Sequence, residues 1–133
     1  MRKVAIGAVI LVALAACSSN SSGGTGTRPL STAKLAILQP TSGQTLSGKD
    51  VEVKLSLEGG TVTTVTVSSA RIKPNIGHIH LRLDGKTITL LGHLDNHIMN
   101  VKPGQHVLEA EYVAQDHLPW RKDILAAVTF KAT

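Results

Sequence analysis

From residue 34 to the end of the chain, apolar and polar positions alternate with a period of two. Such alternation is typical of β-strands with one buried and one solvated face. Asp84 and Gly85 separate two alternating segments and predict a tight hairpin between them. Residues 61–67 are also expected to form a strand, because all of them are threonine or valine, which favour strands. The segments that we expect to be strands are 51–58, 61–67, 78–83, 86–91, 105–114 and 126–130.

No segment after residue 16 has the period of an amphipathic helix. About seven short strands separated by glycine, proline and Asp-Gly turns predict an all-β, two-sheet sandwich, with residues 34–133 as a single domain. The opening residues 38–44 (LQPTSGQ) resemble the first strand and turn of bacterial immunoglobulin-like domains, and the segment from Pro103 to Tyr112 resembles their sixth strand. The resemblance implies an immunoglobulin-like fold, which by itself assigns no function.

The first sixteen residues have the layout of a secretion signal. Arg2 and Lys3 precede an apolar run at 4–14, which is too short to span a membrane and ends in small residues. The sequence Leu14-Ala15-Ala16-Cys17 resembles the lipobox of bacterial lipoproteins, and the resemblance implies cleavage before Cys17 and acylation of its sulfur. Cys17 is the only cysteine and so has no disulfide partner. We therefore expect an extracytoplasmic protein, anchored to the cell membrane or outer membrane by lipid on Cys17.

Residues 17–33 are expected to be a flexible tether. Residues 18–27 carry no apolar side chain larger than a methyl group, so they cannot repay the entropy of ordering. Removal of the signal lowers the formal charge from +5 to +3, because the signal contains Arg2 and Lys3. The remaining positive charges are scattered, and Phe, Trp and Tyr occur once each. This composition does not fit nucleic-acid binding; an envelope protein or cell-wall polymer is the expected partner besides the membrane.

Histidines are the only concentration of chemically active residues. His78 and His80 lie two apart on a predicted strand and therefore share a face, about 6.6 to 6.8 Å apart. If the segments 78–83 and 105–114 pair antiparallel, as the third and sixth strands of immunoglobulin-like sandwiches do, His117 falls near His78. Three imidazoles could bind one Cu(II) or Zn(II) ion. The alternative is that His78 and His80 are ordinary polar residues on a solvated face and that His117 caps a turn.

The remaining motifs add little chemistry. The Gly77-His78-Ile79-His80 strand, with a later Pro-Gly-x-His and Asp-His, resembles a group of small exported bacterial domains of undefined function, and this implies the same sandwich. His106 is expected to be buried and hydrogen-bonded, and His93 and His97 are expected in a loop. No nucleophile elbow or phosphate-binding glycine motif occurs. We therefore expect no catalytic residues, and two functions remain open: a binding or interaction module, and a metal-binding lipoprotein with redox catalysis as its extreme form.

Overall fold

The computed structural model describes residues 27–91 and 93–133, so the predicted signal peptide, Cys17 and most of the tether lie outside it. Within the described residues the chain forms nine strands and one short 3-10 turn, η1. Their bounds are β1 Lys34–Gln39, β2 Thr45–Leu46, β3 Val51–Glu58, β4 Thr61–Val62, η1 Ser69–Arg71, β5 Ile76–Leu83, β6 Lys86–Leu91, β7 Asp95–Ile98, β8 Gly104–Ala114 and β9 Leu125–Ala132. No helix in these two ranges is long and apolar enough to cross a membrane.

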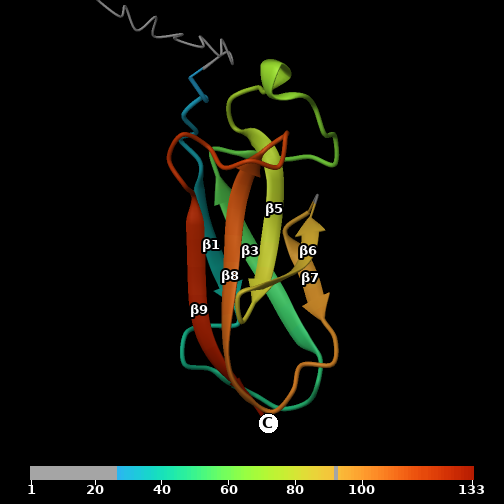
Figure 1. Cartoon of the computed structure of the whole chain (residues 1–133). Coiled ribbons are helices and arrows are strands. Elements are labelled where there is room, and N and C mark those ends of the chain that lie inside the picture. Colours follow the sequence, from blue (N-terminus) through green and yellow to red (C-terminus); the bar gives the residue numbers. More distant parts are fainter. Residues whose placement is uncertain (1–26, 92) are drawn as a thin grey trace, which may run out of the picture.

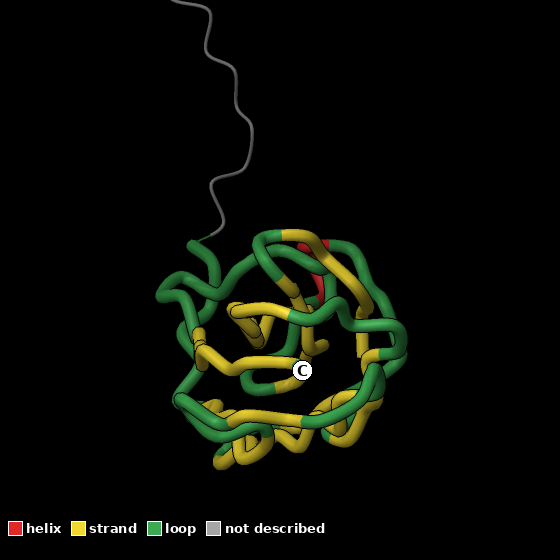
Figure 2. Tube along the Cα trace, turned by 90° about the horizontal axis from the view of Figure 1, so that it is seen from below, coloured by secondary structure: helices red, strands yellow, loops and turns green. Residues whose placement is uncertain are grey.

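The strands form two sheets that pack face to face. The smaller sheet has the order β1-β3-β7, and the larger has the order β2-β9-β8-β5, with β4 and β6 both paired to β5. In Figure 1 the larger sheet lies in front of β1 and β3, and Figure 2 views the molecule from the end that carries the C-terminus. The predicted all-β, two-sheet sandwich is thus confirmed.

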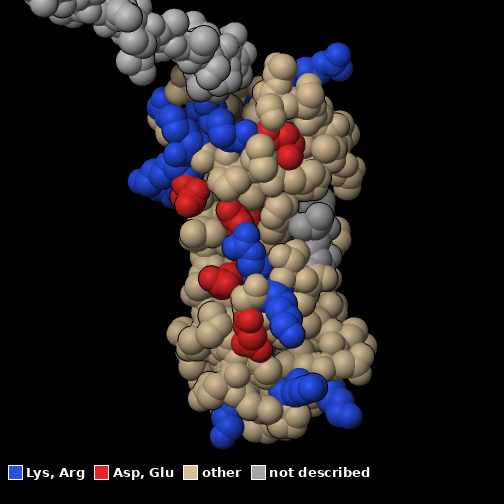
Figure 3. All heavy atoms as spheres, in the orientation of Figure 1, with Lys and Arg blue, Asp and Glu red and all other residues tan. Residues whose placement is uncertain are grey.

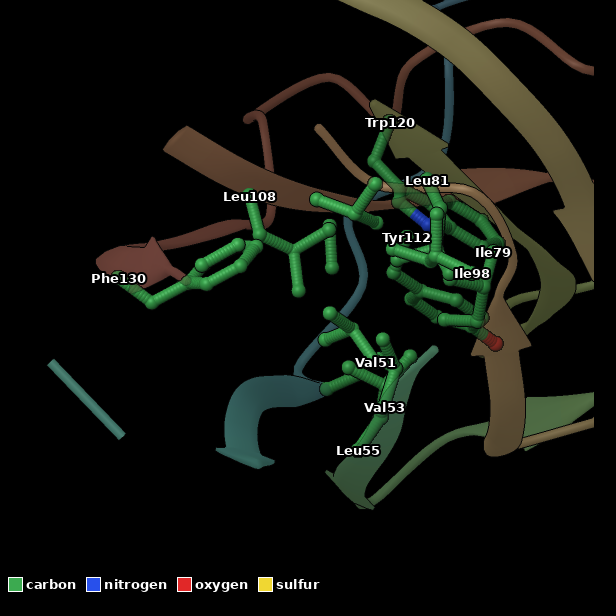
Figure 4. Packing of buried hydrophobic residues seen from close by; sticks show 14 of the residues in the cluster. Val51, Val53, Leu55, Ile79, Leu81, Ile98, Leu108, Tyr112, Trp120 and Phe130 are labelled. Atoms are coloured by element: carbon green, nitrogen blue, oxygen red, sulfur yellow. The ribbon is translucent and has the colours of Figure 1, made fainter. Parts of the chain in front are cut away.

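The core lies between the sheets and follows the predicted alternation. Every second residue of the central strands is buried, and Trp120 joins them from the segment before β9, with its ring centroid 5.6 Å from that of Tyr112. The labelled side chains of Figure 4 point into this layer: Val51, Val53, Leu55, Ile79, Leu81, Ile98, Leu108, Tyr112, Trp120 and Phe130. Burial of a side chain of this size stabilises the fold by roughly 1.5 to 3 kcal/mol.

The pairing of β5 with β8 positions the histidines. The strands run antiparallel, with His78 opposite Val113 and His80 opposite Glu111. Asp84 and Gly85 have φ values of 51° and 77° and form the predicted hairpin between β5 and β6. At Gly77 the two strands approach so closely that an added Cβ would lie 1.9 Å from the Val113 carbonyl oxygen. Only glycine fits there.

The prediction of a strand over 61–67 is wrong beyond Val62. β-branched residues favour a strand only where a partner is available, and after Val62 the chain leaves the edge of β5. Residues 63–75 instead form a loop whose first part is bonded to the β5 and β8 region: the Thr63 amide donates to the Gly77 carbonyl at 2.8 Å, and the Val67 amide donates to the Gln115 carbonyl at 3.1 Å. This loop covers part of the outer face of the larger sheet.

The folded domain also begins earlier than the expected boundary at Lys34. The Arg28 guanidinium forms a bidentate pair with Asp116, with N···O distances of 2.8 and 3.0 Å, and donates to the Leu118 carbonyl at 2.9 Å. Ala33 is buried in the core cluster. Residues 28–33, which the sequence placed in the tether, are therefore part of the domain.

Candidate functional site

The three histidines predicted to act together do lie together. His78 and His80 are on the outer face of β5, and His117 is in the turn after β8 with a left-handed φ of 61°. The rings of His78 and His117 stack, with centroids 4.1 Å apart and planes 3° from parallel. The centroids of His80 and His117 are 5.6 Å apart. The expected strand pairing thus brings residue 117 beside residue 78.

His78 is buried rather than solvated, so the alternative of an ordinary polar surface residue is wrong for this position. Only 3% of its surface is exposed. Its Nδ1 lies 2.7 Å from the Thr63 carbonyl oxygen, and its Nε2 lies 3.2 Å from the Gln115 carbonyl oxygen. A neutral ring can donate to one of these acceptors and an imidazolium to both. In either form, His78 links the 63–75 loop to the end of β8.

His80 and His117 form the more accessible part of the cluster. The His80 Nε2 and the His117 Nδ1 are 3.3 Å apart, and the His117 Nε2 is 3.0 Å from the Thr66 hydroxyl. Burial lowers the pKa of His80, although the Glu111 carboxylate opposes this effect. Burial also lowers the pKa of His117, and the neighbouring His78 ring adds to that effect. Both rings are therefore mainly neutral at pH 7.

Neutral imidazoles can ligate metals, but this arrangement is not a formed metal site. Each free lone pair lies in the plane of its ring, so stacked rings do not direct their nitrogens at one point. Among the residues that the structure describes, no three His, Cys, Asp or Glu side chains are grouped so that they could hold a metal ion. Binding of Cu(II) or Zn(II) by His78, His80 and His117 remains a prediction, and it requires at least one ring to turn.

His106 occupies a separate site at the β5–β6 hairpin. Its side chain is 10% exposed, its Nδ1 lies 2.8 Å from an Asp84 carboxylate oxygen, and its Nε2 lies 2.7 Å from the Lys102 carbonyl oxygen. The Asp84 carboxylate, followed by the Lys102 carbonyl, raises the pKa of His106. The other Asp84 oxygen accepts the Val107 amide at 2.9 Å. The expected hydrogen-bonding role is confirmed, and the centroid of the His106 ring lies 5.4 Å from that of the Phe130 ring.

Comparison with known proteins assigns the fold. No protein-family model matches the chain, and no curated protein matches it. Among solved structures, it is similar to the fibronectin(III)-like modules of Clostridium thermocellum CbhA, with a TM-score of 0.54 and 15% identity over 74% of this chain and 93% of that one. The fold is an immunoglobulin-like β-sandwich. A PKD domain from human KIAA0319 is also similar, with a TM-score of 0.42 and 13% identity over 85% of this chain and 91% of that one.

The two remaining histidines lie in and just before strand β7 of the smaller sheet. His93 is between β6 and β7, as expected for a loop, and its Nδ1 is 2.5 Å from the Asp95 carbonyl oxygen. His97 lies within β7, which pairs with β3, so its assignment to a loop is wrong. Its ring is 3.3 Å from the Asp50 carboxylate, and both side chains are at least half exposed.

The most connected polar group was missed by the sequence reasoning. Asp116 accepts hydrogen bonds from Arg28, from the Ser69 hydroxyl at 2.7 Å and from the Leu118 amide at 3.2 Å. Contact with Arg28, followed by the hydrogen bonds from Ser69 and Leu118, holds the pKa of this carboxyl well below its usual range. Asp116 therefore fixes the turn that carries His117. The Asp-His pair was visible in the sequence, but its partner lies far away in the chain, within the presumed tether.

Proposed function

We propose that the chain is a membrane-anchored extracytoplasmic lipoprotein whose immunoglobulin-like domain binds a partner and carries out no catalysis. The lipobox at Leu14-Ala15-Ala16-Cys17 supports the anchor. An envelope protein or a cell-wall polymer is the partner class that fits such a location. The anchoring lipid itself attaches the protein to the membrane, since two acyl chains hold a protein stably where one does not.

The outer face of β5, β8 and β9 is the observation that carries the binding role. Arg82 pairs with Glu111 at 2.5 Å, and the two side chains are 34% and 9% exposed. Leu125, opposite Glu111 on β9, is 56% exposed, and Ala127 beside it is also exposed. In Figure 3, acidic and basic side chains alternate along this face. The partly buried arginine supports the binding role, because arginine is enriched at protein interfaces and among the residues that dominate their binding energy.

Two experiments test this proposal. Wild-type chain should partition with membranes and carry lipid on Cys17 by mass spectrometry, whereas Cys17→Ala should be unprocessed or released. A photocrosslinking residue at Ala127 should capture a discrete envelope component, and one at Glu52, exposed on the opposite sheet, should not. Equal membrane association of wild type and Cys17→Ala contradicts the anchor. Equal crosslinking from both positions contradicts the binding face.

Metal binding is the second candidate function, with redox catalysis as its extreme form, and the contact of three imidazoles favours it. In the unlipidated mature chain (Cys17→Ala, without a His-tag), wild type should bind one Cu(II) or Zn(II) by titration calorimetry. The His78→Ala/His80→Ala double variant should not bind, and affinity should weaken below about pH 6, because protons compete for imidazole. Absence of binding to wild type, or undiminished binding to the double variant, refutes this function.

A further inference from the structure

The net charge of the domain is concentrated at one end. We define the tether end as the end of the sandwich that carries residues 27–33, the paired strand ends at Lys34 and Glu58, the 63–75 loop and the 115–124 segment (Figure 1). Five exposed cations and two exposed anions lie there beside the mutually neutralising Arg28–Asp116 pair, which leaves a net charge of +3. These seven residues are Lys34, Arg71, Lys73, Arg121, Lys122, Glu58 and Asp123. Six cations and six anions occupy the rest of residues 27–133, so the remainder of the domain is neutral.

Contacts within the tether end connect the segments that carry these charges. The Arg121 amide donates to the Pro29 carbonyl at 3.3 Å. Lys34 and Lys122 line the same shallow hollow. The 3-10 turn that ends in Arg71 is joined to Asp116 by the Ser69 hydroxyl. In Figure 3 the basic side chains gather at this end of the face shown, whereas acidic and basic groups mix below it.

Large apolar side chains are exposed among these cations. Leu30, Val65 and Leu118 are 50%, 58% and 51% exposed. The segments that carry them meet at the tether end, because Arg28 donates to the Leu118 carbonyl and Thr66, next to Val65, contacts His117. An end that exposes both large apolar side chains and an excess of lysine and arginine matches the boundary between lipid headgroups and acyl chains, where apolar groups insert and cations meet anionic headgroups.

The position of the proposed anchor allows this contact. Ten residues lie between Cys17 and Arg28, and a flexible chain of that length would span about 17 Å on average. Given the proposed anchor, this length would keep the tether end within roughly two Debye lengths of the bilayer surface. Residue 27, at which the described part of the chain begins, belongs to the tether end.

We propose that the tether end docks on anionic phospholipid headgroups, with Leu30, Val65 and Leu118 at the interface and Lys34, Arg121 and Lys122 facing the headgroup charges. This inference rests on the proposed lipid anchor, which places the membrane at this end. Docking orients the domain, so that the neutral C-terminal end projects away from the bilayer. The face of β5, β8 and β9 is then parallel to the membrane normal and does not contact the lipid.

Vesicle binding by the unlipidated mature chain (Cys17→Ala) tests the docking separately from the anchor. This chain without further substitutions, called wild type below, should sediment with phosphatidylcholine vesicles that contain phosphatidylglycerol, and added salt should release it. Arg121→Glu/Lys122→Glu should reduce the affinity by about tenfold or more, and Leu30→Ser/Leu118→Ser should also reduce it. The control, Lys49→Glu/Lys102→Glu, makes the same charge change with exposed lysines outside the tether end and should bind within about twofold of wild type. Trp120 fluorescence checks that each variant is folded.

Several results would overturn the docking. These are no binding of wild type to the anionic vesicles, equal binding to vesicles without phosphatidylglycerol, and equal losses in the two charge-reversal variants. Binding to soluble poly(glycerol phosphate) but not to vesicles would also overturn it and would assign the basic end to a wall polymer. Because this chain carries no lipid, failure of docking is distinct from failure of the anchor, which the lipid analysis of Cys17 reports.

Discussion

Gly77→Ala should destabilise the domain strongly, because the methyl group has no space. The added Cβ would lie 1.9 Å from the Val113 carbonyl oxygen and 3.1 Å from the Tyr112 ring. Real Cβ atoms essentially never approach a heavy atom closer than 3.0 Å, so β5 and β8 must separate locally by about 1.1 Å. Backbone atoms of a central strand pair cannot move aside as a flexible side chain does.

The expected loss is about 3 kcal/mol of unfolding free energy, at the upper end of the usual range for overpacking, because the clash falls on backbone. In a domain of this size it corresponds to a drop in Tm of roughly 12 to 24 °C. Gly85→Ala is the matched control: nothing lies within 4 Å of its Cβ, and only the φ of 77° opposes the substitution. That conformational penalty is about 1 to 2 kcal/mol.

Urea unfolding followed by fluorescence measures both variants, since Trp120 is the only tryptophan and is buried in the core. His78 lies next to Gly77 and opposite Val113, so separation of the strands should also disturb the stacked rings. An unfolding free energy of Gly77→Ala equal to that of Gly85→Ala, or within about 1 kcal/mol of wild type, would refute the steric argument.

Three other predictions concern protonation and hydrogen bonding. The pKa of His106 should lie above 6.5 in an NMR titration and should fall in Asp84→Asn. The contribution of protonated His106 to the stability of the fold should be present below pH 6.5 and be lost as the pH rises through the raised pKa. His80 and His117 should titrate below 6.5, and their contribution to stability should be present above 6.5 and be lost as the pH falls through the lowered pKa values. Burial raises the pKa of Tyr112 to about 12, so its absorbance should titrate there, and Tyr112→Phe should lose about 1 kcal/mol with the hydrogen bond to a backbone carbonyl.

Strands whose two faces differ could be predicted from the sequence. The alternation at 51–58 gave β3 with its bounds, and Asp84-Gly85 gave the hairpin, because both signals are local. The pairing of 78–83 with 105–114 was expected from the order of strands in immunoglobulin-like domains, and it brought His117 beside His78.

Contacts made across long sequence separations could not be predicted. The burial of His78 depends on the 63–75 loop, of which propensity alone assigned residues 63–67 to a strand. Arg28 looked like part of a solvated segment because its partner Asp116 lies 88 residues away. In both cases the residue is polar as its sequence context suggests, but its burial or pairing depends on a partner that only the fold brings into contact.

The docking of residues 28–33 also has a mechanical consequence. A pull on the N-terminal side enters the domain at Arg28, whose bonds to Asp116 and Leu118 lie at the edge of the fold and can open one after another. Release of this segment adds roughly 20 Å of extended chain. The β1–β3 ladder begins only at Lys34, so it bears load after this slack is used. Under such a pull, residues 28–33 are therefore expected to detach before the β1–β3 ladder is loaded.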